Sequence, residues 1–410
     1  MAEKKTDAGM SRRNFLRTLG VGGVAAGLAP VLATAALGAD VPAAKGGAMP
    51  QRTLGKTGVK VSALCLGGMF DTINNQLLLK QALSWGVTYW DTAEVYGNGL
   101  SEEGFGRFLA RNPERRKDIF LVTKLTPKAG NFTERLEKSL ARLQTNHVDL
   151  FFIHSLTNIA EMTPEIMAWA AQMKKAGKFK YFGFSTHTNM EDCLLGAAKL
   201  GGPAAGLDVI MHSYNIHLMH KPKMQEAVAA CVQSGLGLVA MKTQGGGPAG
   251  SASEAELRMA ERFIQRGFTD KQAKLKGVWE NKDMASICSQ MPSLTILAAN
   301  VAAAKDQTSL DKAELRSLRE YASACQGYCA GCGSICQQAV GGAVAVNEVM
   351  RALMYHKDYN EPELARQTFA SLPEAARERL GRIDYSRAEA VCPQGLAIAQ
   401  LMREAGELLA

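Results

Sequence analysis

The chain has 410 residues, of which 47% are hydrophobic and 21% are charged, and these proportions are typical of a globular protein. They exclude a collagen-like chain, a fully disordered chain and a multi-span membrane protein. The net charge is +8, but +3 of it lies in the first 39 residues, so the rest of the chain lacks the dense positive charge of a nucleic-acid-binding protein.

The first 39 residues have the composition of an export signal. Arg12 and Arg13 precede an uncharged stretch, rich in Ala, Gly, Val and Leu, that runs from Thr18 to Ala39. Paired arginines before a weakly apolar stretch resemble a twin-arginine signal peptide, which directs folded proteins to the export machinery. We therefore expect residues 1–39 to be a signal peptide and the protein to be periplasmic. A form anchored in the membrane by an uncleaved signal is the alternative.

From residue 51 onward, short apolar segments alternate with amphipathic ones. Residues 52–61 are predicted to form a hairpin with its turn near Gly55–Gly58. The apolar segments that follow are predicted to be buried strands, with helices between them. The eight strands are Ala63–Gly67, Val87–Trp90, Ile119–Thr123, Val148–Ile153, Tyr181–Phe184, Val209–Met211, Leu238–Met241 and Ala285–Cys288. Eight alternating units in about 250 residues favour an α/β fold, a (β/α)8 TIM barrel over residues 51–303 with the hairpin at its bottom.

Four polar side chains follow three of these strands. Asp91 and Tyr96 follow the second strand, Lys124 follows the third and His154 follows the fourth. Because the carboxyl ends of all barrel strands lie at one end, we expect the four groups to converge there. The set suits carbonyl reduction. An ammonium held charged by Asp91 would lower the pKa of the Tyr96 phenol, which would protonate a carbonyl oxygen oriented by His154.

The segments that carry these four residues resemble the aldo-keto reductase family, and the resemblance extends from about Arg52 to about Ala303. It identifies the four residues with the family's catalytic tetrad and implies an oxidoreductase that acts on a small carbonyl or alcohol substrate. It rests on the segments Trp90–Glu102, Val122–Lys124, Val148–His154 and Gly183–Ser185.

The same resemblance implies a site for NADP(H). Ser185 matches a position near the nicotinamide carboxamide, and Tyr214 matches one that can stack on the nicotinamide. Lys242, Gly245 and Gly246 match positions around the phosphates, and Asn300 matches one that can contact the adenine.

Two departures weaken the cofactor assignment. Residues 289–295 contain no Lys or Arg to pair with a 2′-phosphate, and Met211 stands where a glutamine is common in the family. Free nicotinamide cofactors are also scarce outside the cytoplasm. These points leave an alternative function, a nicotinamide-independent electron-transfer or binding protein on a barrel scaffold.

Residues 304–410 are predicted to form a small α-helical, cysteine-rich domain, with helices near 344–355 and 363–380. They contain five of the nine cysteines: Cys325, Cys329, Cys332, Cys336 and Cys392. The other four, Cys65, Cys193, Cys231 and Cys288, lie in apolar patterns typical of small core residues.

The spacing of the five C-terminal cysteines is similar to that of ferredoxin motifs, although the first gap is three residues and Gln337 replaces a proline. We predict one 4Fe–4S cluster. Three of its ligands would come from the group that begins at Cys325, and the fourth would be the remaining cysteine of that group or Cys392. Structural zinc and disulfides are the alternatives. The arrangement resembles a ferredoxin-tailed branch of the aldo-keto reductases and implies a possible redox partner.

Overall fold

The computed structural model describes residues 47–127, 131–245, 258, 262–263, 267–324 and 328–410. The expected export signal, Gly246 and Cys325 lie outside the described residues. The described residues belong to one compact unit, Ala44–Ala410. Over this part of the chain, no helix combines the length and apolar character that a membrane crossing requires.

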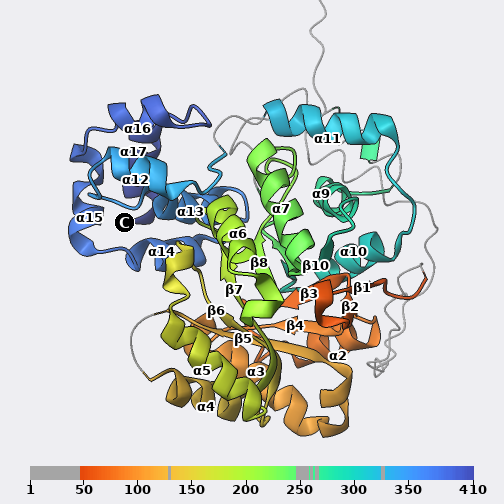
Figure 1. Ribbon diagram of the computed structural model, residues 1–410. Coiled ribbons are helices and arrows are strands. Elements are labelled where there is room, and N and C mark those ends of the chain that lie inside the picture. Colours follow the sequence, from red (N-terminus) through yellow and green to blue (C-terminus); the bar gives the residue numbers. More distant parts are fainter. Residues whose placement is uncertain (1–46, 128–130, 246–257, 259–261, 264–266, 325–327) are drawn as a thin grey trace, which may run out of the picture. The chain divides into compact units, whose positions relative to one another are not determined.

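Eight parallel strands close into a barrel, which confirms the predicted (β/α)8 barrel (Figure 1). Each strand pairs with the next one along the chain, and the last, β10, closes the barrel against the first, β3. The strands are β3 (Leu64–Gly67), β4 (Tyr89–Asp91), β5 (Phe120–Leu125), β6 (Val148–Ile153), β7 (Phe179–Thr186), β8 (Val209–Ser213), β9 (Gly237–Met241) and β10 (Met284–Gln290).

Alternate residues along the strands pack on opposite sides of the barrel wall. The inward set fills the barrel with buried side chains such as Tyr89, Val122, Phe152 and Met211. The outward set, which includes Trp90, packs against the surrounding helices. The interior is therefore a packed core, and only the ends of the strands offer room for a site.

The predicted hairpin consists of β1 (Gln51–Thr53) and β2 (Lys60–Ser62), which pair antiparallel around the short helix η1 (Gly55–Thr57). The Arg52 guanidinium donates hydrogen bonds to the carbonyl oxygens of Asn281 and Met284, at 3.0 and 2.8 Å. These residues lie just before and at the start of β10. The hairpin thus covers the end of the barrel opposite to the one where the strands finish.

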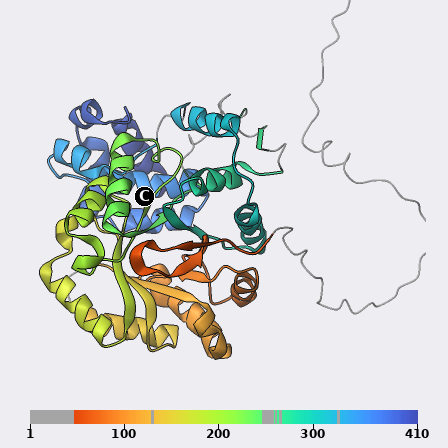
Figure 2. The same ribbon diagram turned by 45° about the vertical axis from the view of Figure 1, so that its right-hand side comes forward.

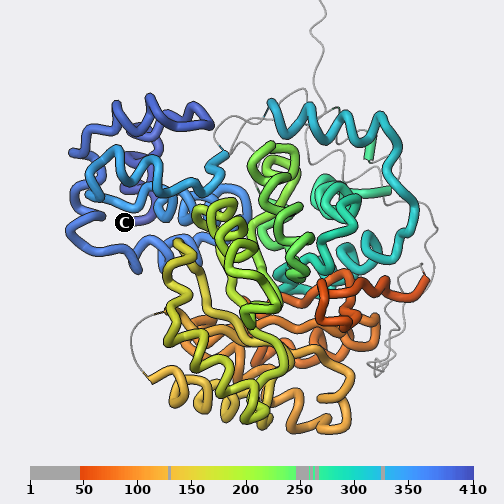
Figure 3. Tube along the Cα trace, in the orientation of Figure 1, coloured from red at the N-terminus to blue at the C-terminus, as the bar shows by residue number. Residues whose placement is uncertain are grey.

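Helices surround the barrel, as the two views in Figures 1 and 2 and the chain trace in Figure 3 show. Helix α4 shows how the sequence determines where such a helix begins and which of its faces is buried. The Asn131 side chain caps its first turn by accepting a hydrogen bond from the backbone N–H of Glu134, and Leu136, Leu140 and Leu143 form its buried face. The helices of this layer are α2 (Gln76–Ser84), α3 (Leu100–Arg111), α4 (Phe132–Leu143), α5 (Pro164–Lys175), α6 (Met190–Lys199), α7 (Pro222–Ser234), α9 (Asp270–Trp279) and α10 (Leu294–Lys305).

Among the described residues, seven further α-helices follow the barrel. They are α11 (Lys312–Ala324), α12 (Gly333–Ala339), α13 (Val346–Lys357), α14 (Pro362–Ala370), α15 (Glu374–Arg379), α16 (Ser386–Val391) and α17 (Ile398–Leu409). Residues of α13, α14 and α17 share an apolar cluster of their own, which contains Val349, Phe369 and Met402. The helix expected over residues 363–380 is interrupted, because Pro373 lacks an N–H and disfavours helical backbone at the residue before it. The domain boundary at residues 303–304 stays a prediction.

The loop before α12 packs against the loop after β7. Gly331 accepts a hydrogen bond at its carbonyl from the backbone N–H of Asn189, at 2.8 Å. Its φ is +78°, and a Cβ at this position would lie 2.6 Å from the carbonyl oxygen of His187. This close approach requires glycine both for its conformation and for its lack of a side chain.

We expect Gly331→Ala to lower the free energy of unfolding by about 1–3 kcal/mol more than Gly341→Ala does. Gly341 has a similar φ of +62°, but a Cβ there would meet nothing within 4 Å, so it controls for backbone strain alone. Urea unfolding followed by circular dichroism would measure both changes. Equal losses in the two variants would show that the fold accommodates a methyl group beside the carbonyl oxygen of His187.

Candidate active site

The ammonium group of Lys124 is the centre of a buried cluster at the carboxyl end of the strands. Its Nζ atom donates hydrogen bonds to Asp91 Oδ2 at 2.5 Å, to the Thr92 carbonyl oxygen at 2.8 Å and to the Tyr96 hydroxyl at 3.3 Å. The Lys124 side chain is only 1% exposed. An ammonium has three protons, and these three acceptors match them in number. The structure therefore brings together three of the four predicted groups.

The strand register explains this convergence. Asp91 is the last residue of β4 and pairs with Val122 of β5, so Lys124 lies two residues further along the same inward face. Tyr96 begins the short helix η2 (Tyr96–Gly99), in the loop after β4. This loop folds back over the strand end and brings the phenol to the ammonium.

His154 follows β6 and completes the predicted set. Its ring meets the Tyr96 ring edge to face, with the ring centres 5.6 Å apart and the planes at 81°. Burial, together with the charge of Lys124, lowers the pKa of His154 well below 6.5, so the imidazole is neutral near pH 7. A neutral imidazole can donate one hydrogen bond to a carbonyl oxygen.

The expected lowering of the Tyr96 pKa is wrong. Burial raises the pKa of this phenol above its usual value, and the nearby ammonium of Lys124 opposes the rise only in part. For Lys124, burial lowers the pKa, but Asp91 and then Tyr96 outweigh that effect, so the net change is upward. The site therefore holds a charged ammonium beside a protonated phenol, which is the pairing needed for proton donation.

The thiol of Cys288 belongs to the same cluster, although the sequence predicted a plain core residue. Its Sγ atom donates to Asp91 Oδ2 at 3.8 Å, the same oxygen that Lys124 contacts. Cys288 lies on β10, in register with the buried Cys65 of β3. Cys288 occupies an inward-facing position near the carboxyl end of its strand, and this position is the signal that could have identified it.

Two of the predicted cofactor residues lie near strand ends, Ser185 on β7 and Asn300 on α10 beside the end of β10. The Ser185 hydroxyl, on β7, accepts a hydrogen bond from the backbone N–H of Ser155 at 3.0 Å, next to His154. Asn300, on α10, donates to the Ser289 hydroxyl at 3.1 Å and accepts from Gln244 at 3.0 Å. Asn300 thus ties the end of β10 to the loop after β9.

Tyr214 is placed away from the cluster. Its ring packs in the layer between barrel and helices, and its hydroxyl accepts a hydrogen bond from Asn281 Nδ2 at 2.8 Å. Met211 packs inside the barrel, and Tyr214 lies three residues further along, so the alternation of the strand turns it outward. The structure therefore disagrees with the expected stacking of Tyr214 on a nicotinamide.

The two described groups expected at the cofactor phosphates contact tyrosines of the C-terminal segment. Lys242 Nζ donates to the Tyr355 hydroxyl at 2.7 Å, and the backbone N–H of Gly245 donates to the Tyr359 hydroxyl at 3.1 Å. A Cβ at Gly245 would lie 2.2 Å from the Tyr359 ring. In this arrangement the single N–H of Gly245 is occupied by a phenol and offers no donor to a dinucleotide phosphate, whereas the Lys242 ammonium, which has three protons, makes one contact with a phenol.

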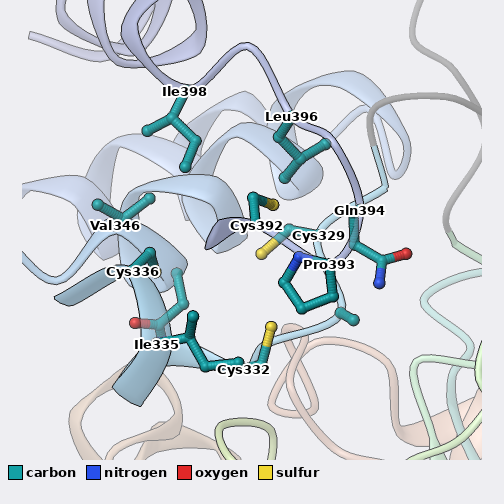
Figure 4. Close-up of a pocket in the computed structure, with 12 residues that line it drawn as sticks. Cys329, Cys332, Ile335, Cys336, Val346, Cys392, Pro393, Gln394, Leu396 and Ile398 are labelled. Carbon is teal, nitrogen blue, oxygen red and sulfur yellow. The ribbon is translucent and has the colours of Figure 1, made fainter. Parts of the chain in front are cut away.

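Four of the five C-terminal cysteines line one pocket (Figure 4). Cys329, Cys332 and Cys336 come from the segment around α12, and Cys392 follows α16. Figure 4 shows the sulfur atoms of Cys329, Cys332 and Cys392 directed toward the same space. Burial raises the pKa of Cys329 to about 12, so this thiol is protonated near pH 7 in the arrangement described. Within the described residues, no group of three or more His, Cys, Asp or Glu side chains has metal-ligand geometry.

Comparison with known proteins places this barrel among oxidoreductases. Residues 64–315 match the Aldo/keto reductase family. The uncharacterized oxidoreductase YrpG of Bacillus subtilis is 32% identical over 238 residues, which cover 51% of this chain and 72% of that protein. The aldo-keto reductase yakc of Schizosaccharomyces pombe, whose name specifies NADP(+), is 33% identical over 124 residues, which cover 27% of this chain and 36% of that protein.

The fold likeness extends to solved structures. A thermostable aldo-keto reductase, solved with the inhibitor epalrestat, superposes with a TM-score of 0.54 at 26% identity. The match covers 67% of this chain and all of that one. This chain therefore contains segments that have no counterpart in that structure.

Proposed function

The chain belongs to the aldo/keto reductase family, and on this premise we propose that it reduces a carbonyl group, or oxidises the corresponding alcohol, with Tyr96 as the general acid/base. The observation that carries the proposal is the Lys124 ammonium, which contacts both Asp91 and the Tyr96 hydroxyl. The loss of turnover in Tyr96→Phe, argued below, is the experiment that tests it.

Each residue of the cluster has a distinct task in reduction. Tyr96 gives its hydroxyl proton to the carbonyl oxygen, and the adjacent ammonium of Lys124 stabilises the phenolate that remains. Asp91 keeps Lys124 charged and in position. The neutral His154 ring donates a hydrogen bond that orients the carbonyl oxygen. NADPH, the cofactor typical of the family, would be held by residues that include Ser185 and Asn300, and it would supply the hydride.

The pKa directions predict a flat pH profile. With an uncharged aldehyde, we expect kcat for reduction to change less than about 2-fold between about pH 6 and about pH 9. Burial keeps His154 neutral because its pKa lies well below 6.5, and burial keeps Tyr96 protonated because its pKa is raised above 10. A steady-state pH–rate series would measure this. A limb centred near pH 6.5 would contradict the neutral imidazole.

A second candidate function is nicotinamide-independent electron transfer or binding on the same barrel. The observation that favours it is the engagement of Lys242 and Gly245 by Tyr355 and Tyr359. Fluorescence titration of the full chain with NADPH separates the two candidates. Binding in the micromolar range supports the reductase, and an absence of binding up to about 1 mM supports the second candidate.

We also propose that the C-terminal cysteines hold one 4Fe–4S cluster. Support comes from the four thiols that line one pocket although Cys392 lies far along the chain from the other three. Such a cluster would be structural or would pass single electrons to a redox partner.

Export through the twin-arginine pathway completes the proposal. The pathway carries folded proteins, so a protein loaded with a cluster inside the cell fits the paired arginines Arg12 and Arg13. Cell fractionation and N-terminal sequencing would test it. A periplasmic chain that begins near residue 40 is the expected result, and a cytoplasmic chain that still begins at Met1 would overturn it.

A further inference from the structure

Helix α13 lies across the barrel end that holds the tetrad. Near its start, Asn347 donates to the Thr188 hydroxyl at 2.9 Å, and Thr188 follows β7. Near its end, the Tyr355 hydroxyl accepts from Lys242, which follows β9. The helix therefore runs from the carboxyl end of one strand to that of another, past the end of β8 between them.

One face of α13 is polar, and it is the face that meets the barrel. Glu348, Arg351 and Tyr355 are spaced three and four residues apart and so share a side of the helix. Glu348 accepts from the Thr188 hydroxyl at 3.1 Å, and Tyr355 contacts Lys242. Arg351, between them, pairs with Glu348. A polar helix face turned toward the loops after β7 and β9 is unusual for simple core packing, which favours apolar contacts.

The charges at this end of the barrel do not cancel. Lys124 is paired with Asp91, and Arg351 is paired with Glu348. Lys242 has no carboxylate partner among the described residues. Its contact is the Tyr355 phenol, with Nζ 4.5 Å from the ring centre. Within the part of the chain that the structure describes, no carboxylate therefore balances this ammonium, whose charge acts on His154.

The backbone conformation at Lys242 is an uncommon one. Its φ is +54°, in the left-handed region that a lysine seldom adopts. Ser155, directly after His154, shares this conformation with a φ of +59°. Such strain tends to gather at functional sites, where it fixes the direction of a side chain.

The pKa of the Tyr355 phenol reflects the positive charges around it. Burial would raise its pKa, but Lys242 and then Arg351 outweigh burial and lower the pKa to about 8. The same two cations contribute to the low pKa of His154. The two cations therefore favour an anionic oxygen at the position of the Tyr355 hydroxyl, which Lys242 contacts.

We propose that Lys242 and Arg351 form an anion-recognition site beside the tetrad, so that the enzyme prefers carbonyl substrates that carry a carboxylate or a phosphate. This inference rests on the proposed carbonyl reduction. It assigns α13 a part in substrate selection, with the Tyr355 hydroxyl as the oxygen that a bound anion would replace or contact.

Matched aldehydes test the proposal. Succinic semialdehyde and butanal differ in a carboxylate, and glycolaldehyde phosphate and glycolaldehyde differ in a phosphate. We expect kcat/KM with NADPH to be at least about 10-fold higher for one of the charged aldehydes than for its neutral partner. The pair that shows the preference identifies the anion.

Two variants assign the preference to the named residues. The double variant Glu348→Gln with Arg351→Gln should reduce the charged-to-neutral ratio about 10-fold while the neutral aldehyde is reduced as before. Lys242→Met should reduce the same ratio about 10-fold. The double variant leaves no unpaired carboxylate behind. Lys357→Met is the matched control, because Lys357 lies on the same helix but pairs with Glu404 of α17.

Calorimetric titration with succinate and with inorganic phosphate gives a readout that needs no turnover. Binding of succinate or phosphate to the unmodified chain, with an affinity about 10-fold weaker in Lys242→Met, supports the anion site. If this binding is seen but no aldehyde is reduced, the result counts against the proposed carbonyl reduction and not against the anion site. Equal kcat/KM values within both aldehyde pairs would overturn the anion site and leave the reductase standing. Weaker NADPH binding in Lys242→Met, with unchanged ratios, would overturn it as well and assign Lys242 to the cofactor.

Discussion

Replacing Tyr96 by phenylalanine is expected to lower kcat for aldehyde reduction by about 10²–10⁴-fold, the usual contribution of a general acid. The change removes only the hydroxyl that contacts Lys124, and the ring can keep its edge-to-face contact with His154. Binding of NADPH should therefore change by less than about 2-fold. Steady-state kinetics and a fluorescence titration would measure the two quantities.

Tyr181→Phe is the matched control for this experiment. It removes the same hydroxyl at the other end of the barrel, where Tyr181 donates to the carbonyl oxygen of Thr57 at 3.4 Å. This variant should retain the activity of the unmodified chain. Comparable turnover in Tyr96→Phe would remove Tyr96 from the mechanism, and equal losses in both variants would indicate damage to the fold.

Replacing Cys329 or Cys392 by serine is expected to abolish the bound iron of the purified protein, from about four atoms per chain to near zero, together with its brown colour. Both thiols line the same pocket, although they come from distant parts of the sequence. A serine hydroxyl is a poor substitute for a thiolate as an iron ligand. Iron and sulfide analysis, with the visible spectrum, would measure the loss.

Cys231→Ser is the control for the cluster. Cys231 is buried on α7, and its thiol donates to the carbonyl oxygen of Leu194 at 3.4 Å, a contact that a hydroxyl can retain. Iron should be unchanged in this variant. An unmodified protein that contains zinc instead of iron, or disulfides among these cysteines, would contradict the cluster assignment.

The barrel and the convergence of its polar residues could be predicted because both follow from local patterns. The buried strands form continuous apolar segments, and residues at their carboxyl ends must share one rim. The contact of Asp91, Lys124 and Tyr96 is a direct consequence of this rule. The outward direction of Tyr214 was also open to prediction, since it lies an odd number of residues after the inward Met211.

The remaining features depend on contacts between distant residues. Nothing near Lys242 or Gly245 in the sequence indicates that tyrosines more than a hundred positions later contact them. The rise in the pKa of Tyr96 depends on how deeply the folded chain buries the phenol, which residue spacing does not reveal. The role of Cys288 was hidden because a cysteine in an apolar strand usually belongs to the core.

Isotope transfer tests the central claim most directly. The full chain would be incubated with an aldehyde and NADPH that carries deuterium at its hydride position, and the alcohol would be examined by NMR. The account predicts deuterium on the former carbonyl carbon, with product formation nearly lost in Tyr96→Phe. An alcohol without deuterium, or no alcohol at all from chain that binds NADPH, would contradict it.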